Sequence, residues 1–61
     1  MTIYCESELL DALKEIIFPK TKYEIISALE KVEDIDEAFV IALDELEDKI
    51  YNSISEICDN A

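Results

Sequence analysis

This 61-residue sequence contains no glycine, no histidine and no arginine, and it has a single proline. Without histidine the chain lacks the commonest general base and the commonest metal ligand. The absence of arginine removes the side chain that best clamps phosphates and carboxylates, and the absence of glycine excludes a glycine-rich phosphate-binding loop. We therefore predict that the protein is not an enzyme and that it uses no cofactor and no metal.

Long apolar runs are absent as well. No stretch approaches the roughly 18 residues of a membrane span, and the first ten residues, MTIYCESELL, lack the basic and apolar regions of a signal peptide. We predict a cytoplasmic protein with no membrane contact, located in the host cytoplasm if it is phage-encoded. Half of the residues (51 %) are apolar, which predicts a folded chain, and its length fits one small domain over 1–61.

Only two cysteines are present, Cys5 and Cys58, near opposite ends of the chain. In a cytoplasmic protein we favour two reduced cysteines that behave as small hydrophobic side chains. The alternative is a disulfide, which requires the two ends of the chain to meet.

Most of the sequence shows the apolar periodicity and capping residues of α-helices. Ser7 is a candidate N-cap for a helix over 6–17, and Pro19 should separate this helix from the next. Its apolar face follows helical spacing. The residues of that face are Leu9, Leu10, Leu13, Ile16 and Ile17.

Three further helices are predicted from pairs with capping-box spacing. Thr21 with Glu24 predicts a helix over 22–32, Asp34 with Glu37 predicts one over 35–48, and Ser53 with Glu56 predicts a short one over 53–59. The expected core residues of the second helix are Ile25, Ile26, Leu29 and Val32, and those of the third are Ile35, Phe39, Ala42, Leu43 and Leu46.

Two segments share one pattern, FPKTKYEI near residue 18 and YNSISEI near residue 51. Each has an aromatic residue, a short polar connection, a Thr or Ser cap, a Glu three residues later and then an Ile. Each is expected to be extended and to lead into a helix, with Ile50 and Tyr51 packed inward. Side by side they would form one minimal β-bridge, although chance explains the similarity equally well. The predicted fold is all-α, a compact bundle of three to four short helices.

Charge is concentrated in EDIDEAFVIALDELED, residues 33–48, which holds eight carboxylates and no base. The other 45 residues carry eight acids and five lysines, a net of −3, so −8 of the total of −11 lies in this stretch. Such a balance opposes direct binding to nucleic acid or anionic lipid and favours a basic partner. EDIDE is superficially similar to a calcium-binding EF-hand loop, but the central glycine and the twelfth-position glutamate are missing.

A helical wheel over 35–48 places one large apolar residue, Ile41, opposite the core face and among carboxylates. An apolar anchor inside a charged rim is the anatomy of a protein-binding site. Val40 either widens this patch or packs under a neighbouring helix. The predicted partner-binding residues are Asp36, Glu37, Val40, Ile41, Asp44, Glu45, Glu47 and Asp48.

The spacing of these charges suggests what they imitate. A helix of sixteen residues is roughly 24 Å long, so eight charges lie about 3 Å apart, close to the ~3.4 Å phosphate spacing of one DNA strand. A solubilising surface would intersperse lysines, which would also stabilise the helix. The unpaired acids therefore favour a nucleic-acid mimic over an ordinary solvated face.

The segment 10–57 resembles a family of short uncharacterised bacterial and archaeal helical domains. Their pattern is aromatic–Pro–x–Thr/Ser–Lys before a helix, an acidic turn, and Tyr–x–Ser/Thr before the last helix. Here it is carried by Phe18, Pro19, Thr21 and Lys22, by residues 34–37, and by Leu46, Tyr51 and Ser53. Leu46-Glu47 replaces the expected Leu-Pro, and the usual glycine is missing. The resemblance implies a compact helical module without a known activity.

In size and charge the chain is also similar to small acidic anti-CRISPR and anti-restriction inhibitors. We predict a non-enzymatic inhibitor, monomeric or weakly dimeric, that blocks the nucleic-acid site of a basic protein such as a CRISPR-Cas or restriction component. The alternative is a cellular protein–protein interaction or regulatory module whose acidic face only keeps it in solution.

Overall fold

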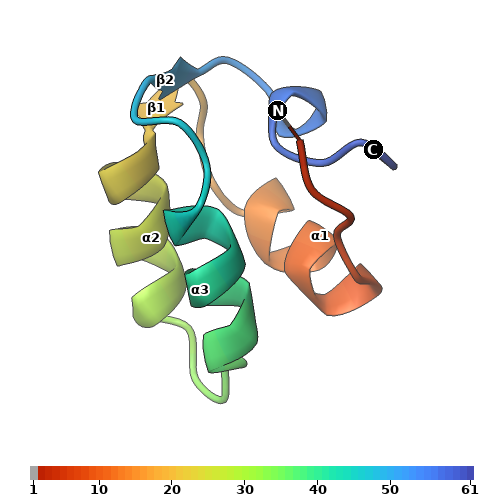
Figure 1. The fold of residues 1–61 in the computed structure, drawn as a ribbon. Helices are drawn as coiled ribbons and strands as arrows, with labels where there is room; N and C mark the ends of the chain where they lie inside the picture. The colour runs from red at the N-terminus through yellow and green to blue at the C-terminus, as the bar shows by residue number, and fades with distance from the viewer. Residues whose placement is uncertain (1) are drawn as a thin grey trace.

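Three short α-helices make up most of the regular structure in a computed structural model, which describes residues 2–61 (Figure 1). Two short strands form an antiparallel pair, and a single 3-10 turn follows near the C-terminal end. The elements are α1 (Ser7–Lys14), β1 (Lys20–Thr21), α2 (Lys22–Glu30), α3 (Glu37–Asp44), β2 (Ile50–Tyr51) and η1 (Ile54–Glu56).

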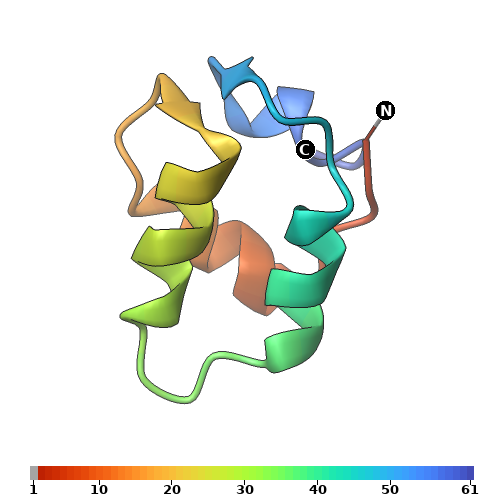
Figure 2. The ribbon, with the colours of Figure 1, turned by 60° about the vertical axis from the view of Figure 1, so that its left-hand side comes forward.

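The helices form two layers. α2 and α3 lie side by side with α1 to the right of α3 in Figure 1, and the turned view of Figure 2 shows α1 behind the other two helices. Each helix contributes two buried apolar residues to the core, and the segments outside the helices contribute the rest. The buried apolar residues are Cys5, Leu9, Leu13, Ile25, Leu29, Phe39, Leu43, Leu46, Tyr51, Ile57 and Cys58.

The predicted pairing of the two aromatic segments is confirmed. Lys20 pairs with Tyr51 and Thr21 with Ile50 in antiparallel register. The fold is therefore helix-dominated but not strictly all-α. Tyr51 packs inward as predicted, whereas Ile50 is 59 % exposed, because successive side chains of a strand point to opposite faces.

The Thr21–Glu24 capping box is present. The Thr21 hydroxyl accepts a hydrogen bond from the Glu24 N–H (3.3 Å), and the Glu24 carboxylate accepts one from the Thr21 N–H (3.0 Å). Hydrogen bonds from the Thr21 N–H and hydroxyl hold the pKa of the Glu24 carboxyl below its usual range. This local signal correctly located the start of α2.

The other predicted helix starts differ from the structure. Two N-caps are displaced by one or two residues, and the third predicted α-helix start leads into a 3-10 turn. Glu6, not Ser7, is the N-cap of α1. Asp34 has a φ of 60° and lies outside α3, whose N-cap is Asp36 with its side chain accepting from the Ala38 N–H. Ser53 precedes a 3-10 turn and makes no cap bond, so the fourth α-helix is not formed within residues 2–61.

All three helices are shorter than predicted. α1 ends at Lys14, which leaves Ile17 beyond the helix and 82 % exposed. α2 ends at Glu30, and Val32 is 42 % exposed. Helical periodicity assigns a face only where the helix continues, so both residues were wrongly placed in the core.

A disulfide joins Cys5 to Cys58, with 5.5 Å between the two Cα atoms. The segments near residues 3 and 58 lie side by side (Figure 1). They are also held by hydrogen bonds from the Ile3 N–H to the Ile57 oxygen and from the Asp59 N–H to the Ile3 oxygen. The prediction of two reduced cysteines is therefore wrong. Disulfides persist in oxidising surroundings, so the presence of this bond disagrees with the predicted cytoplasmic location.

Candidate functional site

Ile41 is 62 % exposed on the outer face of α3, where the helical wheel placed it. The neighbouring carboxylates Glu37, Asp44 and Glu45 are also exposed, while Phe39 and Leu43 of the same helix are buried. α3 thus separates an apolar inner face from an outer face on which one large apolar side chain stands among acids.

The last four residues of the predicted acidic helix, 45–48, are not helical. α3 ends at Asp44, and Glu45 is its C-cap. The Glu45 N–H donates to the Ala42 oxygen, and the Leu46 N–H donates to the Leu43 oxygen. Glu47 and Asp48 are exposed in the loop that leads to β2. The eight charges therefore do not follow one helix axis, and the argument from their linear spacing is wrong.

One of the acids is neutralised from inside the fold. The Nζ atom of Lys22, a residue only 7 % exposed, lies 3.9 Å from the Asp44 carboxylate. It also donates to the main-chain oxygens of Asp44 (3.0 Å) and Leu46 (3.2 Å). Residues 33–48 contain no lysine, but Asp44 is paired with a lysine from another helix. Within residues 2–61 the other carboxylate paired with a lysine is Asp11, 4.0 Å from Lys14.

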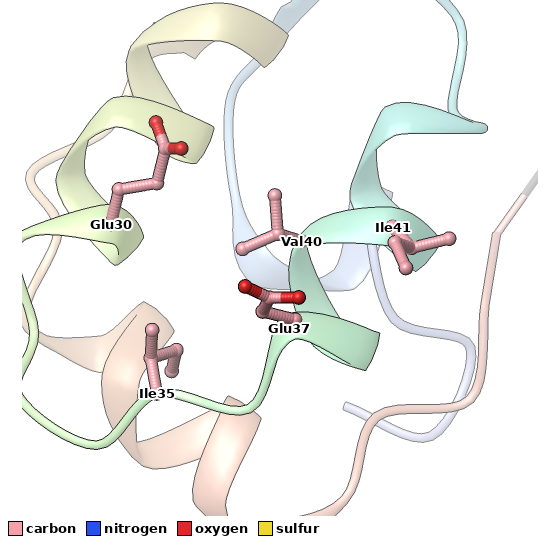
Figure 3. A pocket seen from close by; sticks show the side chains of 5 residues that line it. All are labelled: Glu30, Ile35, Glu37, Val40 and Ile41. Atoms are coloured by element: carbon pink, nitrogen blue, oxygen red, sulfur yellow. The ribbon is translucent and has the colours of Figure 1, made fainter.

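Val40 is half-buried and faces a surface hollow between α2 and α3 rather than lying under a neighbouring helix. The hollow has a volume of about 360 Å³. In Figure 3 Val40 lies between Glu30 and Ile41, with Glu37 beside it and Ile35 on the α2–α3 connection. Glu30 was not among the predicted site residues and Ile35 was predicted to lie in the core, because a helical wheel of one helix cannot show what the next helix contributes.

The loop that carries Glu47 and Asp48 is fixed by Tyr51. This side chain is fully buried, and its hydroxyl donates to the Glu47 main-chain oxygen at 2.6 Å. Burial raises the pKa of the Tyr51 phenol, and the nearby carboxylates of Glu47, Asp48 and Glu56 raise it further.

We expect Tyr51→Phe to lower the free energy of unfolding at neutral pH by about 1 kcal/mol, because one hydrogen bond is lost. The raised pKa means that tyrosine stabilises the fold below its ordinary pKa of about 10 and loses this contribution as pH rises through the folded-state pKa. The difference between the two proteins should therefore shrink in strongly alkaline solution. Urea denaturation across this pH range measures it, and a constant difference would contradict the assignment.

Within residues 2–61 no group of three or more His, Cys, Asp or Glu side chains is arranged to hold a metal ion. In the same range no helix has the length and apolar character needed to cross a membrane.

Comparison with protein families gives a match over most of the chain. A family model described as "Protein of unknown function (DUF2795)" matches residues 5–58, which include all helices, both strands and both cysteines. No curated protein and no solved structure matches the chain. The resemblance to a short uncharacterised domain family is confirmed, over a slightly longer stretch than the 10–57 expected from its motifs. The similarity to anti-CRISPR proteins finds no support in these comparisons.

Proposed function

Because the chain belongs to the DUF2795 family, whose description assigns no activity, we propose a function from its surface. The protein is a non-enzymatic binding module that docks its acidic face on a basic, nucleic-acid-binding protein. In the most concrete version it inhibits that partner by occupying its nucleic-acid site, as anti-CRISPR and anti-restriction proteins do.

One observation carries the proposal: most of the charge is not neutralised inside the molecule. A net charge of −11 is held on a body measuring 25 × 21 × 19 Å, and of the eight acids in residues 33–48 only Asp44 is paired with a lysine in the described part of the chain. Such a field attracts a basic groove and speeds its encounter. The proposal is therefore supported by the high density of negative charge on a small body, and no longer by the spacing of charges along one helix.

Ile41 gives the acidic face an apolar centre. Charged rims mainly set the rate of association and its salt dependence, whereas desolvated apolar anchors slow dissociation. The proposed contact residues are Asp36, Glu37, Val40, Ile41, Asp44, Glu45, Glu47 and Asp48.

The alternative is a cellular interaction or regulatory module whose acids only keep it in solution. It is favoured by the positions of three residues that carry the family resemblance. Thr21 caps α2, Lys22 binds the end of α3, and Tyr51 anchors the following loop. These residues explain the fold and leave the acidic face unexplained.

The test is inhibition of DNA cleavage by purified CRISPR-Cas effectors and restriction endonucleases. We expect dose-dependent inhibition of a susceptible enzyme that weakens with added salt. The double variant Glu45→Lys with Asp48→Lys should inhibit it about tenfold less or worse, because two exposed attractions become repulsions. Asp44 is left unchanged since it pairs with Lys22.

A matched control makes the same charge change elsewhere. Glu6 and Asp59 are exposed and lie outside the proposed contact residues, so Glu6→Lys with Asp59→Lys should inhibit nearly as well as the unchanged protein. Equal loss in both variants, or no inhibition of any enzyme, would favour the solubilising alternative.

A further inference from the structure

A second hollow adjoins the one between α2 and α3. It has a volume of about 330 Å³ and lies between α1 and the α2–α3 connection, and Ile35 lines both hollows. Its lining residues are Glu8, Asp11, Ala12, Glu15, Val32, Glu33, Asp34 and Ile35. Because the two hollows share Ile35 as a lining residue, we treat them as one candidate binding surface, which we call the double hollow.

Four apolar side chains line the double hollow. Val32 is 42 % exposed and Ile41 is 62 % exposed, and Ile35 and Val40 are half-buried. Exposed apolar side chains are ordinary when they are scattered. Here four of them line adjoining concave surfaces, which is typical of a binding groove.

The rim of the double hollow is acidic on both sides. Five carboxylates line the hollow beside α1, two line the hollow beside α2, and no lysine lines either one. The single ion pair on the rim, Asp11 with Lys14, is 4.0 Å long and exposed, so solvent screens most of it. An occupant of this groove must therefore bring positive charge as well as apolar surface.

We propose that the double hollow binds a basic amphipathic helix of a partner protein. Such a helix presents apolar side chains three or four positions apart on one face, with Lys or Arg on both sides of that face, and helices bind in grooves of this kind. The proposal rests on the proposed function, because it takes the partner to be a basic protein. It extends the apolar contact surface from Val40 and Ile41 to Val32 and Ile35, which precede α3.

The chemistry of the groove separates this occupant from others. Nucleic acid and anionic lipid are repelled by the rim carboxylates. A second copy of this chain brings a net charge of −11, so self-association adds repulsion instead of relieving it. A basic helix satisfies the apolar lining and the acidic rim together.

The test uses a synthetic amphipathic peptide of about 18 residues, with leucines on one helical face and lysines elsewhere. A peptide of the same composition, with its leucines scattered around the helix, is the control. Calorimetric titration gives the affinities, and amide chemical shifts locate the binding site. We expect shifts to concentrate at residues 8–15 and 30–41, and the amphipathic peptide to bind about tenfold more tightly than the scattered one.

Matched variants test the apolar lining of the double hollow without changing charge. Val32→Asn with Ile41→Asn should weaken binding of the amphipathic peptide about tenfold. Ile17→Asn with Ile50→Asn also removes two exposed apolar side chains, but outside both hollows, and should leave binding unchanged. Circular dichroism shows that each variant is folded.

Three outcomes would overturn the proposal. Equal binding of the two peptides, or equal effects of the two variants, would show that attraction is only electrostatic. Dimerisation through the double hollow, seen by ultracentrifugation, would make a second copy the occupant. The proposed function fails separately: if the peptide binds as expected but no nucleic-acid enzyme is inhibited, the groove stands and the inhibitor role does not.

Discussion

Reduction of the Cys5–Cys58 disulfide is expected to lower the free energy of unfolding by about 4 kcal/mol. The bond links positions 53 residues apart, and in the chain-entropy account a cross-link that closes so long a loop restricts the unfolded chain by about this amount. Small domains bury little surface, and typical stabilities are about 5–15 kcal/mol. The bond should therefore supply a large share of the total stability.

Urea denaturation with and without a thiol reductant measures this effect, and Cys5→Ser with Cys58→Ser should reproduce it. Asn60→Ala is the control, since Asn60 joins the same two chain ends by hydrogen bonds to the Cys5 N–H (2.9 Å) and oxygen (2.8 Å). Its loss should cost only about 1–2 kcal/mol. Equal urea midpoints for the oxidised and reduced protein would show that the bond contributes nothing to stability.

Helix starts were partly predictable because a start is marked locally. The Thr21–Glu24 box is formed by two side chains and the main chain within four residues, so the sequence alone contains the signal. Asp36 shows the limit of this reasoning. Its cap bond reaches only to Ala38, and the competing pair Asp34–Glu37 had the right spacing but the wrong backbone, because Asp34 has a φ of 60°.

Helix ends were not predicted, although the sequence contains a repeated signal. Helices often end at a glycine, and this chain has none. Each helix instead ends in an Ala-Leu-x-x-apolar segment, ALKEI, ALEKV or ALDEL. In each, the fourth residue donates its N–H to the alanine oxygen and the fifth donates to the leucine oxygen. The pairs are Glu15–Ala12 and Ile16–Leu13, Lys31–Ala28 and Val32–Leu29, and Glu45–Ala42 and Leu46–Leu43.

The candidate site was predictable only where one helix defines it. Ile41 and its acidic neighbours belong to a single helical face, which a wheel can assign. The double hollow is formed by residues of all three helices and of the α2–α3 connection, and no periodicity within one segment indicates such an arrangement. The pairing of Asp44 was missed for the same reason, since its partner lies 22 residues earlier in the chain.

Lys22 is the residue through which the tertiary structure fixes the end of α3. Its Nζ atom donates to the oxygens of Asp44 and Leu46, and its N–H donates to the Lys49 oxygen at 3.3 Å. The last carbonyls of a helix have no partner within the helix and carry partial negative charge. A buried ammonium group at this position satisfies two main-chain oxygens and stabilises the helix dipole.

We therefore expect Lys22→Met, which keeps the apolar stem, to lower the free energy of unfolding by about 3 kcal/mol, because two main-chain oxygens lose a charged donor. Lys49→Met is the matched control. It removes the same charge from an exposed side chain whose Nζ lies 5.2 Å from the centre of the Tyr51 ring, a contact worth about 0.5–1 kcal/mol. Urea denaturation compares the two. Similar losses of unfolding free energy in both variants would mean that water hydrogen-bonds to these oxygens as well as Lys22 does. Lys22 would then have no special role in stabilising the fold.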